Sequence, residues 1–253
     1  MSAEQWSYDL IAEVYATDMG QSMPFDDVAF YRQQCSIAAG RMLELGCGTG
    51  RILLPLIRAG FDMYGIDRSL PMLKRLCRDA AALGLAPPPV AQMNLDALAL
   101  AGPFAVVLAP YSLITYVTDP VAVRRLLREI ATLLHSDGTL VLDAFIPQPV
   151  VSYADFRLDY RRPHADGALE RSKRIEALAD GTNHIVRRYR LFGPDGSRGS
   201  EFETDERIRP YSPEDLATMA NDAGFVVTGW TFDYGGRADA RAARFASVAM
   251  CLG

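Results

Sequence analysis

The sequence predicts an α/β fold, with a mostly parallel sheet covered by helices on both faces and an antiparallel β-meander inserted after the fifth strand. Two observations carry this prediction. Over residues 41–146, short strands that are apolar on both sides alternate with amphipathic helical segments, which is typical of a parallel sheet buried between helices. Between residues 157 and 209 the chain becomes polar and alternating, as expected for antiparallel strands with one solvated face.

The elements follow in chain order, and the residues that begin and end them are visible in the sequence. Ser69 and Ser212 are expected N-caps, each followed by an early proline, and Gly60 and Gly84 close two helices. Apart from helices in residues 1–40, we expect helices over 50–60, 70–84, 121–135 and 211–225, and strands over 41–45, 61–67, 87–94, 104–110, 138–145, 169–178, 183–192, 201–210, 226–234 and 244–252.

Neither an internal repeat nor a low-complexity linker divides the chain. We therefore expect a single domain over residues 1–253. Its expected parts are an N-terminal helical lid (1–40), a ligand-binding half (41–146), the inserted antiparallel sheet (151–210), and a C-terminal helix with the last two strands (211–253).

Composition narrows the possible partners. The 253 residues are 49% hydrophobic and carry a formal net charge of −5, which argues against nucleic acid as a partner. No apolar run approaches the roughly 20 residues of a membrane span, and no secretory signal is visible. The four cysteines form no CxxC pair and the chain has three histidines, so we expect no zinc site, reduced thiols and a cytoplasmic location.

The stretch "MLELGCGTGRI", residues 42–52, is the most informative of the chain. A dinucleotide-binding turn requires GxGxxG, but Arg51 occupies the place of its third glycine. A P-loop is excluded because no Gly-Lys-Ser/Thr follows. The remaining interpretation is a tight turn whose backbone approaches a ligand at the carboxyl edge of the sheet. About 20 residues later, Asp67 ends the second strand, where a carboxylate can accept both hydroxyls of a ribose.

These residues resemble a known family. "LELGCGTGR" with "GIDRS" is similar to the cofactor-binding half of the class I S-adenosylmethionine-dependent methyltransferases, and "MNLDAL", "FAVVLAPYSLITYV", "LLHSDGTLVLDAF" and "AGFVV" resemble later segments of that family in order. The resemblance covers residues 8–145 and resumes near Tyr211. It implies a Rossmann-like seven-stranded sheet with an antiparallel last strand, and S-adenosyl-L-methionine as the cofactor.

The resemblance also implies roles for individual residues. The glycine loop, with Cys47 inside it, would approach the amino-acid part of the cofactor, Glu44 would orient the cofactor's amino group, and Asp67 would take the ribose hydroxyls. The remaining implied contacts are Arg68, Met72, Leu95, Asp96 and Ala97 around the adenosine, and Ala109, Pro110 and Tyr111 under the methionine and sulfonium. The implied loop glycines are Gly46, Gly48 and Gly50.

Methyl transfer from a sulfonium needs an aligned acceptor and a dry site more than it needs acid or base groups. Aromatic faces attract the positive sulfonium, so the candidate walls are Tyr8, Tyr15, Tyr111 and Tyr116, although aromatic residues at helical spacing also serve as core. Asp143, which ends the fifth strand, is the expected polar contact to the acceptor. We expect no metal site. The candidate bases His135, His164 and His184 are more typical of a helix end or a surface.

The inserted sheet resembles, in position and pattern, the insert of bacterial N-methyltransferases that act on small molecules or nucleotide-linked sugars; this is fold-level analogy. The expected function is methyl transfer to an amine nitrogen of a small molecule, with a homodimer through the inserted sheet as a possible assembly. An O- or C-methyltransferase acting on a natural product is the alternative, and a cofactor-binding protein without transfer activity is the second alternative.

Overall fold

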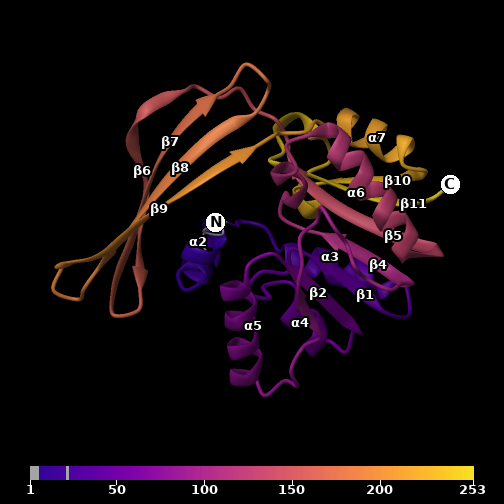
Figure 1. Ribbon diagram of the computed structural model, residues 1–253, viewed down its shortest axis with the longest axis horizontal. Coiled ribbons are helices and arrows are strands. Elements are labelled where there is room, and N and C mark those ends of the chain that lie inside the picture. Colours follow the sequence, from indigo (N-terminus) through magenta and orange to yellow (C-terminus); the bar gives the residue numbers. More distant parts are fainter. Residues whose placement is uncertain (1–5, 21–22) are drawn as a thin grey trace. The chain divides into compact units, whose positions relative to one another are not determined.

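The computed structural model describes residues 6–20 and 23–253, and the chain divides into two compact units. We call residues 25–147 and 210–253 the core unit, and residues 1–24 and 148–209 the meander unit. Figure 1 shows both units and labels most of their helices and strands. The predicted N-terminal lid is thus divided, because its first two helices group with the inserted sheet and its third helix groups with the core.

The core unit contains the predicted seven-stranded sheet, in the order β10-β11-β5-β4-β1-β2-β3. The strands β1 to β5 run parallel, and β11 is antiparallel to both of its neighbours, β5 and β10. The strand bounds are β1 Met42–Leu45, β2 Met63–Asp67, β3 Val90–Gln92, β4 Phe104–Ala109, β5 Leu134–Phe145, β10 Phe225–Phe232 and β11 Phe245–Leu252.

Helices cover both faces of this sheet, as the alternating pattern predicts. One face packs against α3, α4 and α5 through side chains such as Met42 and Val106, and the other packs against α6 and α7 through Leu43 and Val107. Successive strand residues point to opposite faces, so both sets are apolar. The helix bounds are α3 Asp27–Ser36, α4 Leu53–Arg58, α5 Leu70–Ala82, α6 Pro120–Leu133 and α7 Pro213–Asp222.

The helix caps form where the sequence places them. The Ser69 side chain accepts from the Met72 N–H, and Ser212 and Asp215 form a reciprocal capping box. One boundary differs from the prediction: α6 ends at Leu133 and β5 already begins at Leu134, because Leu134 pairs with Phe104 of β4. His135 therefore lies in a strand and not at a helix end.

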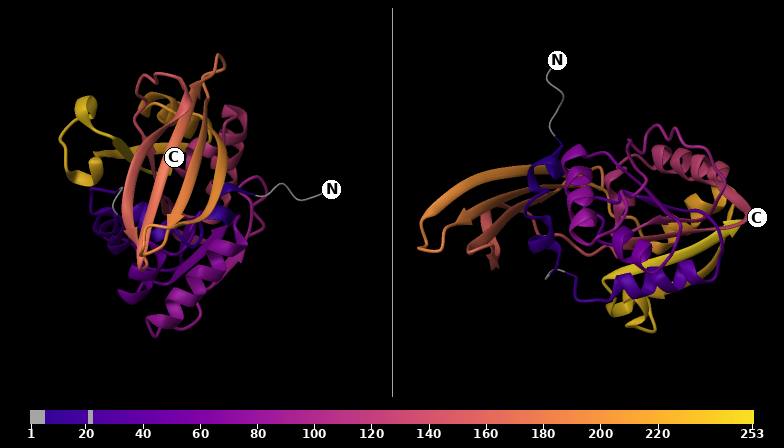
Figure 2. Two further views of the ribbon diagram at one scale, coloured as in Figure 1. Left: turned by 90° about the vertical axis from the view of Figure 1, so that its left-hand side faces the viewer. Right: turned by 90° about the horizontal axis from the view of Figure 1, so that it is seen from below.

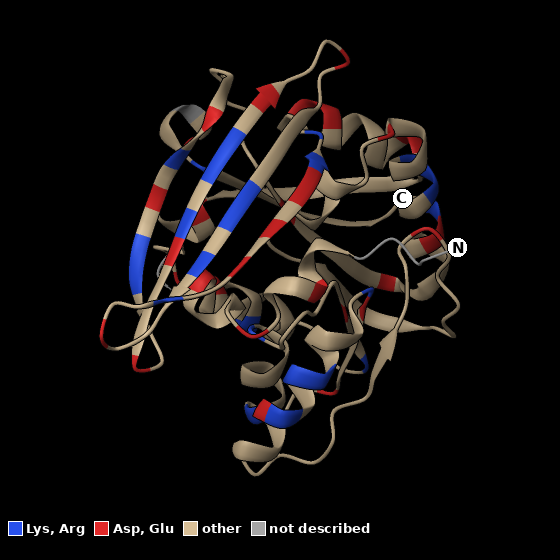
Figure 3. Cartoon of the chain, turned by 60° about the vertical axis from the view of Figure 1, so that its left-hand side comes forward, with Lys and Arg blue, Asp and Glu red and all other residues tan. Residues whose placement is uncertain are grey.

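The meander unit is a four-stranded antiparallel sheet in the order β6-β7-β8-β9 (Figure 2). Its strands are β6 Tyr153–His164, β7 Gly167–Ala177, β8 Asn183–Phe192 and β9 Arg198–Ile208. Residues of both charge signs occur along β6, β7 and β9, whereas β8 carries arginines and neither Asp nor Glu (Figure 3). The unit also contains two short helices in the part of the chain where helices are expected, α1 Ser7–Ile11 and α2 Tyr15–Gly20, with residues 12–14 between them.

Candidate functional site

The glycine loop between β1 and α4 is a tight turn, as predicted. Gly46, Gly48 and Gly50 all have positive φ, at 65°, 53° and 83°, a region that residues with a side chain rarely enter. The Cys47 N–H donates to the Ile66 carbonyl at 2.9 Å, which fastens the turn to β2. Cys47 itself is buried, and burial raises the pKa of its thiol, so it contributes backbone to the loop and no reactive thiolate.

The three glycines have different surroundings. A Cβ on Gly46 would lie 2.7 Å from Cδ1 of Leu113, and one on Gly50 would lie 2.8 Å from Cγ of Leu54. These two positions are closed by packing. A Cβ on Gly48 would meet no described atom nearer than 4.0 Å, so the backbone of Gly48 is the open part of the loop. A ligand can approach the main chain closely there.

Asp67 joins the end of β2 to this loop. Its Oδ2 accepts from the Gly48 N–H at 2.8 Å, and its Oδ1 accepts from the Ser69 N–H at 2.7 Å. The side chain is half-buried. Because each carboxylate oxygen can accept a second bond, the carboxylate is fixed in direction and still able to receive hydroxyl groups.

A buried acidic group lies beside the loop. Glu44 is 2% exposed, and its Oε2 has no hydrogen-bond partner among the described residues. The same holds for Oδ2 of Asp27, whose Oδ1 pairs with Nη1 of Arg51 at 2.7 Å. Burial raises the pKa of Glu44, and the nearby Arg51 guanidinium opposes that rise. Buried carboxylate oxygens without partners are costly unless a cationic ligand uses them.

The residues that the resemblance implies around the adenosine differ in how exposed they are. Asp96 lies on the loop after β3, exposed and 3.8 Å from the Arg125 guanidinium. Leu95 packs against the core, and Arg68 and Ala97 are exposed. Met72, expected to lie against the adenosine, is 1% exposed, because the first turn of α5 directs its side chain inward. Ala109 and Pro110 are buried at the end of β4.

The loop after β4 has a strained backbone. Tyr111 and Ser112 are consecutive, both have a φ of 55°, and each such conformation costs on the order of 1–2 kcal/mol for a residue with a side chain. Their two N–H groups donate to the Asp143 carboxylate at 2.9 and 2.6 Å. The hydroxyls of Tyr31 and Tyr234 donate to the same carboxylate.

Asp143, the polar contact to the acceptor expected from the sequence, is enclosed by groups of the protein. Its side chain is 0% exposed and its oxygens already accept four hydrogen bonds. Burial raises the pKa of Asp143, and the four donors oppose that rise. Its direct partners are groups of the protein.

Aromatic side chains surround this loop. The Tyr111 ring lies 5.7 Å from Phe145 and 5.6 Å from the guanidinium carbon of Arg51, and Phe145 lies 4.6 Å from Phe245. Phe145 is 38% exposed, and Tyr116, in the 3₁₀ helix η1 (Leu113–Tyr116), is half-buried. Sequence reasoning missed Phe145, although it stands two residues after Asp143 at the carboxyl edge.

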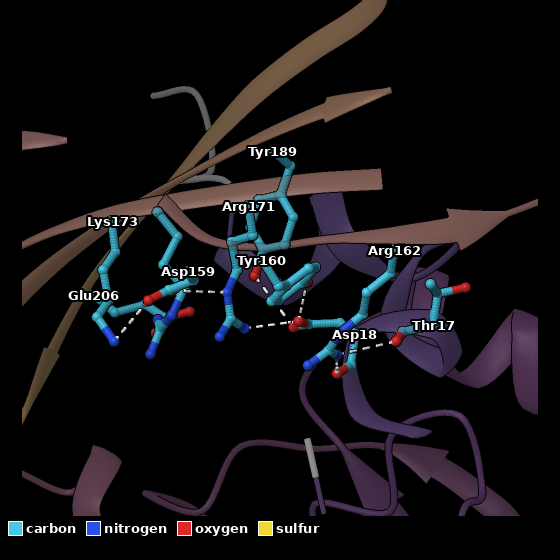
Figure 4. A network of polar contacts seen from close by, with 10 residues as sticks. Thr17, Asp18, Asp159, Tyr160, Arg162, Arg171, Lys173, Tyr189 and Glu206 are labelled. Atoms are coloured by element: carbon cyan, nitrogen blue, oxygen red, sulfur yellow. Dashed lines mark hydrogen bonds and ion pairs between the residues drawn. The ribbon is translucent and has the colours of Figure 1, made fainter. Parts of the chain in front are cut away.

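Asp18 of α2 is the centre of a polar network in the meander unit (Figure 4). Its carboxylate accepts from Nη1 of Arg171 at 2.7 Å and from the hydroxyls of Tyr160 and Tyr189. Nη1 of Arg162 donates to the Asp18 carbonyl at 2.6 Å. These bonds fix α2, and with it the predicted Tyr15, to β6, β7 and β8.

The other predicted residues of the meander unit also make contacts within that unit. Tyr8 of α1 lies 6.0 Å from Tyr15, ring to ring. His164 and Thr17 are joined at 2.8 Å, and Nε2 of His184 and Asp205 at 2.7 Å. Tyr15 belongs to the meander unit, whereas Tyr111, Tyr116 and Asp143 belong to the core unit, so the pocket expected from all four stays a prediction.

No group of three or more His, Cys, Asp or Glu side chains within residues 6–20 and 23–253 could hold a metal ion. None of the described helices is long and apolar enough to cross a membrane.

Comparison with known proteins connects this geometry to a family. Residues 42–138 match the methyltransferase domain family. A ubiquinone biosynthesis O-methyltransferase from Caulobacter sp. (strain K31) is 33% identical over 106 residues, which are 40% of this chain and 39% of that protein. The match with this relative thus spans well under half of either chain.

Solved structures share the fold over nearly the whole chain. The CcbJ methyltransferase from Streptomyces caelestis has a TM-score of 0.81 at 24% identity, covering 99% of this chain and 100% of that one. An S-adenosylmethionine-dependent methyltransferase from Clostridium acetobutylicum ATCC 824 has a TM-score of 0.81 at 16% identity, with 97% and 99% covered. The sugar N-methyltransferase KedS8 from Streptoalloteichus sp. ATCC 53650 has a TM-score of 0.73 at 19% identity, with 98% and 94% covered.

The family match falls on the segment from β1 to the start of β5, which includes the glycine loop, Asp67 and the loop after β4. The seven-stranded sheet with its antiparallel β11 is the fold that the resemblance implied. Residues 42–138 are therefore similar to a methyltransferase domain, and the chain has the fold of the S-adenosylmethionine-dependent methyltransferase structures that it matches.

Proposed function

We propose that this protein transfers a methyl group from S-adenosyl-L-methionine to an amine nitrogen of a small-molecule acceptor. The observation that carries the proposal is the open backbone of Gly48 between two residues suited to the cofactor, Glu44 and Asp67. The bound cofactor supplies an activated methyl group on a positive sulfonium.

The residues present fit this cofactor. The partnerless Oε2 of buried Glu44 is a suitable acceptor for an ammonium group, which would also reduce the cost of burying that carboxylate. Asp67 would receive the ribose hydroxyls while its backbone partners keep it oriented. Asp96 would accept from the adenine amine, flanked by Leu95 and Ala97. Asp27 and Arg51, which the sequence did not suggest, border the same buried acidic group.

The protein's contribution to the transfer would be alignment and exclusion of water. Tyr111 would place an aromatic face at the carboxyl edge, where such a face favours a nearby positive sulfonium. Tyr15 and Tyr116 are further candidates for the acceptor wall. An amine acceptor that arrives uncharged needs no strong base, and this agrees with the engaged state of His164 and His184.

An O- or C-methyltransferase is the alternative, and the partial match to a ubiquinone biosynthesis O-methyltransferase keeps it open. The fold shared with a sugar N-methyltransferase supports the amine. Turnover of methyl-labelled cofactor against a panel of amino sugars, amino acids and phenols decides between them. Cofactor binding without turnover on any acceptor would favour a binding protein without transfer activity. A homodimer through β6–β9 and a cytoplasmic location stay predictions.

The purified protein is expected to bind S-adenosylmethionine and its demethylated product, and to bind neither NAD nor ATP. Asp67→Ala should weaken cofactor binding by about 1–3 kcal/mol, because hydrogen bonds to a charged acceptor are lost. Calorimetric titration measures both effects. Unchanged affinity in the variant would make Asp67 only a support of the turn, and tight NAD binding in place of the methionine cofactor would contradict the whole assignment.

Two glycine substitutions form a matched control for this site. Gly48 and Gly84 have φ values of 53° and 71°, and at neither position would a Cβ meet a described atom closer than 4.0 Å. Alanine should therefore strain both backbones similarly. Only Gly48→Ala is expected to weaken cofactor binding, by about tenfold, or about 1.4 kcal/mol. Equal affinities in the two variants would show that the cofactor does not approach Gly48.

Activity is expected to survive a chelator, and the rate to rise with pH toward the pKa of the acceptor amine. The reason is that the neutral amine is the nucleophile and no obligatory metal is proposed. Initial rates across pH, with and without chelator, test this. Chelator-sensitive turnover would indicate metal-assisted O-methylation. A pH–rate profile with a midpoint at about 6.5 that disappears in His164→Ala or His184→Ala would indicate a histidine base.

A further inference from the structure

The four donors to the Asp143 carboxylate are of two kinds. The hydroxyls of Tyr31 and Tyr234 can rotate and either donate or accept, whereas the N–H groups of Tyr111 and Ser112 can only donate. The two N–H donors belong to two consecutive residues in the left-handed conformation, a pairing also found at Asp233 and Tyr234. The Asp143 carboxylate thus binds a strained segment of backbone.

A second contact joins the same loop to the same strand. The Ser112 side chain is fully buried, and its Oγ accepts from the Phe145 N–H at 2.7 Å. Two groups at the end of β5 therefore bind residues 111–112: the Asp143 carboxylate and the Phe145 backbone N–H.

The loop that contains residues 111–113 lies next to the glycine loop, which is assigned to the cofactor. The side chain of Leu113 closes the space over Gly46, and the Tyr111 ring lies 5.6 Å from the guanidinium carbon of Arg51, which directly follows the glycine loop. A shift in residues 111–112 would therefore move the Tyr111 ring and loosen the contact with Gly46.

We propose that Asp143 is a positioning residue for methyl transfer: it fixes the left-handed backbone of Tyr111 and Ser112 and so holds the Tyr111 ring at the carboxyl edge of the sheet. The proposal rests on the proposed function, because it assigns the loop to the transfer site. It replaces the direct acceptor contact expected from the sequence. Asp143 would act through the loop and would touch neither cofactor nor acceptor.

Asp143→Asn tests this selectively. In the variant, the hydroxyls of Tyr31 and Tyr234 can turn and accept from the new amide, but one of the two loop N–H groups must then face an N–H₂ group and lose its acceptor, whichever way the amide is oriented. Tyr31→Phe is the matched control. It removes one hydroxyl donor from the same buried carboxylate, keeps the ring, and leaves both loop N–H groups bound.

Two readouts are combined. Residue-resolved amide hydrogen exchange should show the N–H of Tyr111 or Ser112 exchanging about tenfold faster or more in Asp143→Asn, and unchanged in Tyr31→Phe. With the best acceptor of the panel, kcat of Asp143→Asn should fall by about 100-fold, as expected for a misplaced reacting group. Cofactor affinity should stay within a few-fold, and kcat of Tyr31→Phe should stay close to that of the wild type.

Unchanged exchange at both amides in Asp143→Asn would overturn the proposal. The proposal would also be overturned if kcat fell equally in the two variants, in parallel with their losses of thermal stability. A carboxylate with a purely structural role would give that result. Absence of turnover by the wild-type protein with every acceptor rejects the proposed function and the catalytic part of this proposal, whereas the exchange rates still decide whether Asp143 holds the loop.

Discussion

Asp18→Ala is expected to destabilise the meander unit by about 3–5 kcal/mol, the usual cost of removing one partner of a buried ion pair. Asp18 is 5% exposed and is the shared acceptor of Arg171, Tyr160 and Tyr189. Without it, the guanidinium and two hydroxyls stay largely buried with fewer partners, and α2 loses its principal side-chain contact with the strands. Denaturant unfolding, followed by far-ultraviolet circular dichroism, measures the change.

Asp222→Ala is the control for that experiment. Asp222 pairs with Nε of Arg124 at 2.8 Å, but its side chain is 47% exposed, so its loss should change stability by no more than about 1 kcal/mol. Similar free energies of unfolding for the two variants would show that the Asp18 network is held as loosely as a surface ion pair.

Removal of the meander unit is expected to abolish methyl transfer and to leave cofactor affinity within a few-fold. The variant begins at residue 25 and joins residue 147 to residue 210 through a short glycine–serine linker. All residues assigned to the cofactor, from Glu44 to Pro110, lie in the core unit. The N-terminal helices must be removed as well, because α1 packs on β9 and α2 packs on β6.

Two measurements decide that prediction: calorimetric titration with the demethylated cofactor, and turnover with the best acceptor. A cooperative thermal transition must first show that the shortened chain folds. Loss of cofactor binding from a folded core unit would contradict the division of roles, and retained turnover would place the whole acceptor site in the core unit.

The features that the sequence could predict are those determined by near neighbours. The positive φ values of Gly46, Gly48 and Gly50, and the caps at Ser69 and Ser212, depend on a few adjacent residues. Three of the four meander strands also follow from local alternation and turn residues. The strand β6, Tyr153–His164, was not predicted, and the polar alternating stretch was expected to begin only at residue 157.

The features that it could not predict depend on residues far apart in the chain. The hydroxyls that reach Asp143 come from positions 112 and 91 residues away, and no local pattern marks Tyr31 or Tyr234 as its partners. The boundary between α6 and β5 was misplaced for a similar reason, because pairing with Phe104 extends the strand beyond what local propensity indicates. The burial of Asp143 could not be predicted either, because its position at a strand end says nothing about burial.

The position of β11 has a consequence for synthesis of the chain. Residues 245–252 lie between β5 and β10, one strand in from the edge of the core sheet, although they come last of its strands in sequence. While the ribosome is still adding them, β5 has β4 on one side and an unpaired edge on the other, and β10 has no partner strand in that sheet. Unpaired apolar edges invite association with other chains. We therefore expect the nascent protein to depend on chaperones until its final strand emerges, and a stall before residue 245 to yield aggregates instead of a smaller folded domain.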